Sequence, residues 1–177
     1  LEAALRIDEW VYEPGLPSNV ARPEAHAFEP VDAALALWAQ GADPAELDTT
    51  GWTTHHWLHF LRNQPEDLTR ERMAELDKAF DFTNTGNSEI LEIWLQLTIA
   101  HGYEPADRAL ERFLTGQGRM KFLIPLYKAL AETPQGLERA RQIYAQARPR
   151  YHPLAAQAVD SILGWKDGGV RPARSAS

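Results

Sequence analysis

The stretch SEILEIWLQLTIA at residues 88–100 decides the fold class of this chain. Its apolar side chains cover almost the whole circumference of a helix, at positions Ile90, Leu91, Ile93, Trp94, Leu95, Leu97 and Ile99. A helix that is apolar on all sides belongs in the interior of a protein. Asn87 or Ser88 can cap its first turn, and Gly102 is placed to end it. The stretch therefore predicts a long, buried helix at the centre of the molecule.

Amphipathic segments flank this central helix on both sides. Upstream, apolar residues recur at helical spacing from Val31 to Trp38 and over residues 52–61 and 68–80. Downstream, further helices are expected to open near residues 105, 119, 134 and 153, and with residue 88 these openings recur roughly every 14 to 19 residues. Strand signals are nearly absent, and only residues 80–85 could be extended. The expected fold is all-α, an armadillo/HEAT-like superhelix of about 8–10 helices stacked as hairpins.

Prolines and glycines divide the chain into three parts. Residues 11–30 contain four prolines and Gly15, a density that predicts an extended connector. We expect a helical domain over residues 31–163 and a flexible tail over residues 164–177. The chain starts at Leu1, without a methionine, and enters at once a helix-like segment. We therefore expect it to be a piece of a longer protein.

Composition excludes several classes of function. The 177 residues contain no cysteine, which removes disulfides, thiolate catalysis and cysteine-bound zinc. A net charge of −7 disfavours nucleic acid and anionic membranes as partners. No run of 18 apolar residues is present, and the first residues lack the features of a signal peptide. These observations favour a soluble protein without a nucleic-acid or membrane partner.

Constellations that could carry catalysis are weak in this sequence. His55 and His59 lie one helical turn apart, which is a spacing that zinc proteases use for two metal ligands. The Glu that follows the first His in that motif is missing here. Packing and hydrogen bonding are therefore the favoured roles for the histidines of this segment. No serine lies in a nucleophile elbow. Solvated helix faces and helix N-termini account for the candidate carboxylates, which are Glu89, Glu92, Glu104 and Asp107. We therefore expect no catalytic residue and no metal ligand in this chain.

Arg119 and Lys121 form the most informative polar feature, because they fall in the opening turn of a predicted helix. A helix N-terminus already carries a partial positive charge, so two cations there ask for an anion opposite them. Arginine fits a carboxylate with two parallel hydrogen bonds, and lysine adds a mobile point charge. The pair therefore suggests a carboxylate or phosphate site. The alternative is that Arg119 only binds carbonyls at the end of the preceding helix.

Three segments together resemble a known family. They are WVYEPGLP at residues 10–17, FTNTGNSEI at 82–90 and QGRMKF at 117–122, with Pro125 and Leu126 shortly behind. In this order and spacing they are similar to the C-terminal region of zinc aminopeptidases of the leukotriene A4 hydrolase type. The resemblance covers roughly residues 7–163, and the Gly-Arg-Met-Lys-Phe segment is its most specific part.

This resemblance implies a function for the cationic turn. It implies that residues 1–30 are the end of a catalytic domain and a proline-rich linker, followed by an α-helical domain. It also implies that Arg119 and Lys121 bind the carboxylate of a short peptide substrate, with Arg119 the more important. The zinc ion and the catalytic motifs of that family belong to an upstream catalytic domain of the same chain and are absent from these residues. The segment is therefore expected to be inactive alone, with no cofactor of its own.

The alternative from another class is a stand-alone helical scaffold that binds a partner protein or peptide on its concave face. A small enzyme with unrecognised chemistry is a third possibility. A cytoplasmic location is expected, with the periplasm as the alternative. A domain that normally packs on a catalytic partner should expose an apolar surface, whereas a dedicated scaffold should present a polar rim.

Overall fold

The computed structural model describes residues 6–20 and 26–165 of the chain. Over these residues it contains nine α-helices and no strand. The helices are α2 (Ile7–Tyr12), α3 (Glu29–Ala39), α4 (Thr54–Arg62), α5 (Arg70–Phe80), α6 (Ser88–His101), α7 (Asp107–Gly116), α8 (Met120–Ala131), α9 (Pro134–Ala147) and α10 (Pro153–Leu163). Short 3-10 turns lie between several of them, namely η1 (Pro44–Glu46), η2 (Phe82–Asn84), η3 (Glu104–Ala106) and η4 (Arg148–Arg150). The all-α expectation is confirmed.

Side-chain caps fix the helix boundaries that the sequence predicted. The side-chain oxygen of Asn87 accepts a hydrogen bond from the backbone N–H of Glu89 at 3.0 Å, and so starts α6. Thr133 accepts one from Gly136 at 3.0 Å and so starts α9. Gly102 ends α6 with φ of 65°, a left-handed conformation that glycine adopts without strain.

Helix α6 is the buried centre of the fold, as its apolar sequence predicts. It packs against α4 on one side and against α8 on another. Trp94 and Leu95 have no exposed surface. The Trp94 ring contacts Phe82 and Tyr103, and its indole N–H donates a hydrogen bond to the Thr83 hydroxyl at 3.0 Å. The only polar atom of this large side chain is therefore satisfied inside the core.

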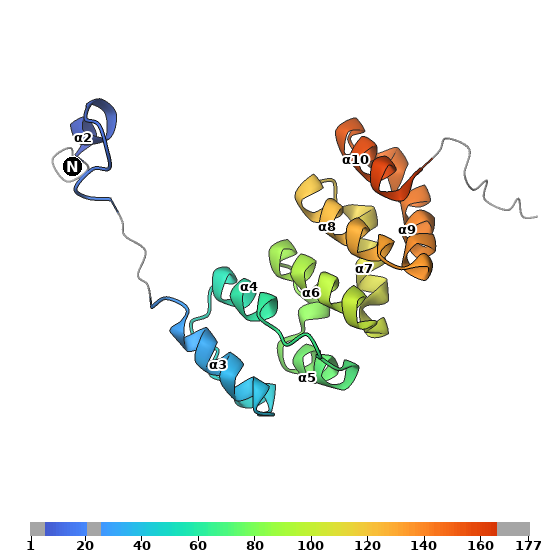
Figure 1. Ribbon diagram of the computed structural model, residues 1–177, viewed down its shortest axis with the longest axis horizontal. Coiled ribbons are helices and arrows are strands. Elements are labelled where there is room, and N and C mark those ends of the chain that lie inside the picture. Colours follow the sequence, from blue (N-terminus) through green and yellow to red (C-terminus); the bar gives the residue numbers. More distant parts are fainter. Residues whose placement is uncertain (1–5, 21–25, 166–177) are drawn as a thin grey trace, which may run out of the picture.

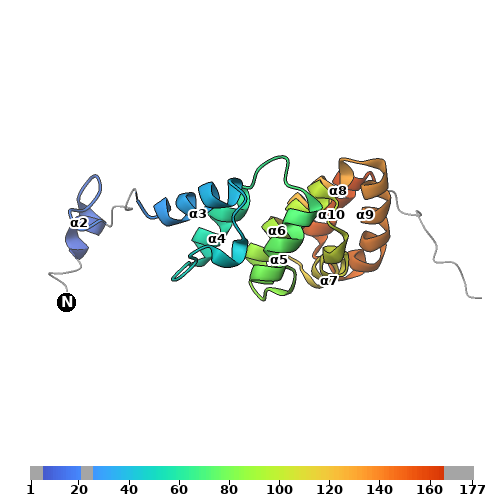
Figure 2. The same ribbon diagram turned by 90° about the horizontal axis from the view of Figure 1, so that it is seen from below.

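The helices stack into a curved, two-layered body over residues 26–165 (Figure 1). In one layer α8 packs against both α6 and α10, and in the other α7 packs against α9. Figure 2 shows that the helices follow one another from one end of this body to the other. This is the stacked-hairpin superhelix that the spacing of helix openings predicts. Within the described residues no helix combines the length and apolar character needed to cross a membrane.

Some local details refine the sequence-based expectations. Residues 82–84 form the turn η2, so the possible extended segment there is wrong. Pro125 lies in the interior of α8 and not in its first turn, and because proline has no N–H the carbonyl of Lys121 loses its helical donor. Helix α3 starts at Glu29, within the segment expected to be an extended connector. At the other end, Trp165 lies just beyond α10, and its ring packs against Tyr144. The rest of the expected tail, residues 166–177, lies outside the described residues.

Candidate functional site

The two cations of the QGRMKF segment lie at the start of α8. Arg119 is its N-cap residue and Lys121 is its second residue, and the first turn contains no acidic side chain. The helix thus begins with two positive charges at its positive end, where they are unfavourable unless an anion compensates them. The predicted position of both residues in the opening turn of a helix is confirmed.

Lys121 has its compensating anion within the fold. Its ammonium lies 2.7 Å and 2.6 Å from the two carboxylate oxygens of Glu89, which stands in the first turn of α6. An ammonium group has three N–H donors, so two contacts leave one donor for another acceptor. The Lys121 side chain is 66% exposed, so this remaining donor is open to a ligand.

Arg119 is exposed, and its guanidinium makes no hydrogen bond or ion pair with any residue that the structure describes. The alternative of an arginine bound to the end of the preceding helix is not what the structure shows. At that end the carbonyl of Phe113 accepts its hydrogen bond from the backbone N–H of Gln117 at 2.8 Å. All five N–H donors of Arg119 are therefore without a partner among the described residues.

The turn that carries Arg119 is fixed from both sides. Before it, the side-chain amide of Gln117 donates a hydrogen bond to the Ser88 hydroxyl at 3.2 Å. After it, Lys121 pairs with Glu89. Both links go to the first turn of α6, so the backbone on either side of Arg119 is tied to the central helix. Because this backbone is already held in place, less backbone entropy is lost when Arg119 binds an anion.

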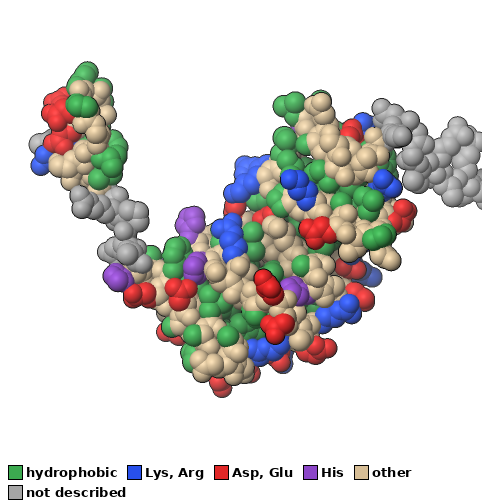
Figure 3. All heavy atoms as spheres, viewed as in Figure 1, with side chains coloured by type: hydrophobic (Ala, Val, Ile, Leu, Met, Phe, Trp, Pro, Cys, Tyr) green, Lys and Arg blue, Asp and Glu red, His purple; other side chains and the backbone are tan. Residues whose placement is uncertain are grey.

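The first turns of α6 and α8 meet at one edge of the helical stack. The amide of Asn87 extends this edge to α4, because it donates a hydrogen bond to the Thr54 hydroxyl at 2.9 Å. In Figure 1 the N-terminal ends of α6 and α8 face the hollow of the curved body, and Figure 3 shows lysine and arginine side chains gathered there. Partial positive charges of two helix ends and the two cations thus point to the same hollow.

Glu92 is a buried carboxylate one turn along α6 from Glu89. It is only 6% exposed and accepts a hydrogen bond from the Gln96 side chain at 2.5 Å. Burial raises its pKa above the ordinary value for glutamate, against the opposing effect of that hydrogen bond. The expectation that Glu92 lies on a solvated helix face is wrong, because α4 and α8 cover this part of α6.

This environment gives a prediction for the variant Glu92→Gln. The pKa of Glu92 is higher in the folded state than in the unfolded state, so ionised Glu92 favours unfolding. The resulting loss of stability is complete at a pH above the pKa of the folded state. It is absent at a pH below the pKa of the unfolded state. The variant should therefore be more stable than the wild type at pH 8, with the difference shrinking toward pH 4. Urea denaturation at several pH values measures it. A difference that stays constant with pH would show that Glu92 does not titrate abnormally.

Two histidines of α4, His56 and His59, have the structural contacts expected from the sequence, whereas His55 is exposed. His56 accepts the backbone N–H of Thr53 at 2.9 Å and so caps its own helix. His59 pairs with Asp32 at 2.7 Å and stacks on the Phe28 ring with centroids 4.5 Å apart. Among the described residues, no group of three His, Asp or Glu side chains is arranged to hold a metal ion.

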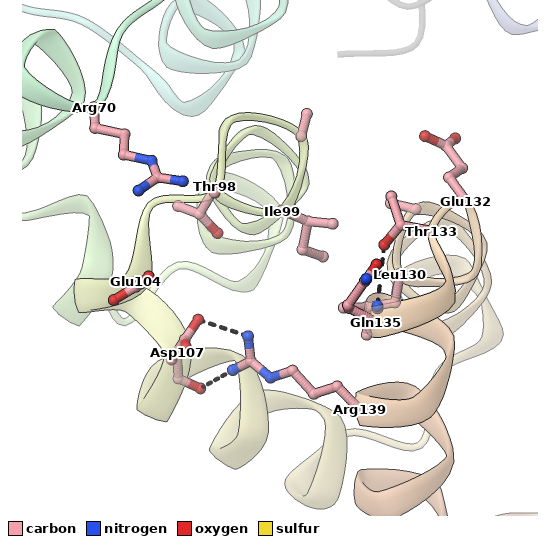
Figure 4. Close-up of a pocket in the computed structure, with 14 residues that line it drawn as sticks. Arg70, Thr98, Ile99, Glu104, Asp107, Leu130, Glu132, Thr133, Gln135 and Arg139 are labelled. Atoms are coloured by element: carbon pink, nitrogen blue, oxygen red, sulfur yellow. Dashed lines mark hydrogen bonds and ion pairs between the residues drawn. The ribbon is translucent and has the colours of Figure 1, made fainter.

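A cavity of about 390 Å³ lies between the C-terminal ends of α6 and α8 and the first turns of α7 and α9 (Figure 4). Its two cations already have partners. Arg139 donates to the Asp107 carboxylate at 2.6 Å and to the Asp107 carbonyl at 3.2 Å, and Arg70 donates to the His101 carbonyl at 3.3 Å. Arg70 keeps further N–H donors, but the lining also contains three acidic side chains, Glu104, Asp107 and Glu132. With three acidic groups against two cations, the cavity is a poorer carboxylate site than the turn at Arg119.

The fold is that of an all-α domain of stacked helices with a cationic turn at one edge. The family model described as "Leukotriene A4 hydrolase, C-terminal" matches residues 52–163, and the chain belongs to this family. Curated relatives include Leucine aminopeptidase 2 of Pyricularia oryzae, 29% identical over 163 residues, and human Aminopeptidase RNPEPL1, 28% identical over 174 residues. These matches cover 88% and 91% of this chain, but only 26% and 24% of the relatives.

A solved structure confirms the fold assignment. The native yeast LTA4 hydrolase matches with a TM-score of 0.64 at 20% sequence identity, over 89% of this chain and 29% of that structure. At this identity the match establishes the fold alone. The chain thus spans about a quarter of the length of its curated relatives and corresponds to one domain of larger aminopeptidases. The resemblance seen in the three sequence segments is confirmed.

Proposed function

We propose that this chain is the C-terminal domain of a zinc metallo-aminopeptidase that removes N-terminal residues from short peptides. Family membership and the names of the curated relatives support this proposal. In it, residues 1–30 are the end of the catalytic domain and a linker, residues 31–163 are the helical domain, and residues 164–177 are a tail. The domain is inactive alone, because cleavage belongs to the catalytic domain upstream.

Exposed apolar side chains near the start of the chain support a larger parent protein. In the described segment 6–20, the side chains exposed by 45% to 80% are Ile7, Trp10, Val11, Tyr12 and Leu16. A cluster of large apolar side chains in water is unfavourable and is typical of a surface that another domain covers. The segment therefore favours a domain that packs on a partner over a self-contained scaffold.

The observation that carries the proposed function is the uncommitted guanidinium of Arg119 on a fixed turn beside Lys121. In the proposal, Arg119 binds the C-terminal carboxylate of the peptide with two parallel N–H···O bonds, and the free donor of Lys121 adds a third. In the same proposal, the zinc ion and its activated water belong to the catalytic domain, as the family resemblance implies.

Binding at the far end of the peptide can accelerate cleavage as well as improve affinity. A clamp on the carboxylate sets the distance from the last residue to the scissile bond, and so favours peptides of one length. Part of its binding energy is available to align that bond. We therefore expect Arg119 to affect kcat as well as KM.

The test of the domain assignment is to determine the coding sequence that precedes Leu1 in the source of this chain. We expect an in-frame His-Glu-x-x-His motif followed by a further glutamate, the ligand set of a zinc peptidase. A start codon directly before Leu1 would contradict the proposal, and the scaffold interpretation would then replace it.

A further inference from the structure

We propose that Glu89 determines specificity at this site, making it select peptides with a single carboxylate and disfavour peptides whose last residue is Asp or Glu. This inference rests on the proposed function, because it concerns the same peptide end. From sequence alone, Glu89 is one of the carboxylates that solvated helix faces and helix N-termini explain. The structure instead places its carboxylate directly against one of the two cations of the site.

The contact between Glu89 and Lys121 is close and open to solvent. Both carboxylate oxygens lie within 2.7 Å of the ammonium, and the side chains are 33% and 66% exposed. The two residues are 32 positions apart and come from neighbouring helices, so the pair is a feature of the fold. A ligand that reaches Arg119 will therefore have a fixed negative charge nearby.

The charges at this edge match one carboxylate. Arg119 and Lys121 contribute two positive charges and Glu89 one negative charge, which leaves one positive charge for a ligand. One helical turn along α6, Glu92 and the nearby Arg62 add one charge of each sign and leave this balance unchanged. A single carboxylate on Arg119 neutralises it. A second carboxylate from an acidic last residue would meet Glu89 with no cation left to compensate it, and like charges repel across such a partly exposed site.

The rival role for Glu89 is to position Lys121 and the turn that carries Arg119. The second link of the turn, from Gln117 to Ser88, does not involve Glu89 and remains when its charge is removed. The two roles predict opposite results. Loss of a positioning residue should lower activity on all peptides, whereas loss of a repelling charge should raise activity selectively on acidic ones.

The experiment uses the complete enzyme and three tripeptides that share their first two residues. One ends in alanine with a free carboxylate, one in alanine amide and one in aspartate. In the wild type, the ratio of kcat/KM between the acid and the amide tests the proposed function. In Glu89→Gln, the ratio between the aspartate and alanine peptides should rise about fivefold, the size expected for one partly screened charge.

Two further variants make the sign of the effect decisive. Lys121→Met removes a positive charge from the same pair, so it should lower the ratio of aspartate to alanine peptides. Glu89→Asp keeps the charge and should keep the wild-type ratio. The matched control is Asp107→Asn, which breaks the ion pair between α7 and α9 with Arg139 and should change the ratio by less than about twofold.

The results test the proposed function and the role of Glu89 separately. Both are supported if the wild type prefers the free-acid alanine tripeptide to its amide, and if Glu89→Gln raises the ratio of kcat/KM between the aspartate and alanine peptides. The same preference with an unchanged or lowered ratio overturns the role of Glu89 and leaves the proposed function standing. A wild type that cleaves acid and amide equally well overturns the proposed function, and the inference falls with it. Circular dichroism checks that each variant is folded.

Discussion

Replacing Arg119 by alanine in the complete enzyme should reduce kcat/KM on a free tripeptide by about 30- to 1,000-fold. This corresponds to about 2–4 kcal/mol, the range for truncating one partner of a desolvated charge pair. The physical reason is that Arg119 offers an uncommitted guanidinium on a turn that Ser88 and Glu89 hold in place. Steady-state kinetics with a chromogenic or chromatographic assay measures the loss.

The matched substrate for this prediction is the same tripeptide with an amidated C-terminus. It lacks the anion, so Arg119→Ala should change its cleavage far less. Lys121→Ala should cost less than Arg119→Ala on the free acid, because two of the three lysine donors already face Glu89. An equal loss on the acid and the amide would mean that Arg119 acts on the fold or on some other part of the substrate.

Replacing Trp94 by alanine should destabilise the 177-residue chain by about 3–5 kcal/mol, the range for large aromatic residues in a core. Trp94 has no exposed surface, packs between Phe82 and Tyr103, and satisfies its N–H at Thr83. The variant leaves a cavity at the centre of the fold. It also removes the indole N–H that donates a hydrogen bond to the Thr83 hydroxyl. Urea denaturation followed by circular dichroism gives the change in the free energy of unfolding.

The control for this prediction is Trp10→Ala, because Trp10 is 54% exposed and its N–H reaches only the exposed Asn19 side chain. It should cost less than about 1 kcal/mol in the isolated chain. Equal effects of the two variants would contradict the central position of α6. A Trp94→Ala variant with near wild-type stability would do the same.

The helices could be predicted from sequence because local signals define them. The apolar circumference of residues 88–99 predicts a buried helix, and α6 is buried where Trp94 and Leu95 pack. Thr133 followed by Pro134 predicts the start of α9, and the Thr133 hydroxyl caps it as expected. These features depend on residues a few positions apart, which periodicity and capping rules capture.

Contacts between helices could not be predicted in the same way. The charge rule for helix N-termini indicates that Arg119 and Lys121 need an anion, but it does not say which one. Glu89 supplies it because the first turns of α6 and α8 lie together, and periodicity contains no information on that pairing. The burial of Glu92 is not predictable from periodicity for the same reason, since it depends on the helices that cover α6.

The proposed binding of a peptide carboxylate at the cationic turn depends on family resemblance and not on residue chemistry alone. Composition and spacing predict only an all-α domain with a candidate anion-binding turn. The order of the three segments around residues 10, 82 and 117 added the family, which the match over residues 52–163 confirms. The structure adds the anchors on both sides of Arg119, which the segment itself does not reveal.

The most direct test of the central claim is a crystal structure of the complete enzyme with a non-hydrolysable tripeptide bound. We expect the C-terminal carboxylate of the peptide to lie roughly 2.7–3.0 Å from the guanidinium nitrogens of Arg119, with Lys121 still paired to Glu89. A peptide whose carboxylate lies against another part of the protein, with Arg119 facing solvent, would contradict the assignment of this turn as the carboxylate site.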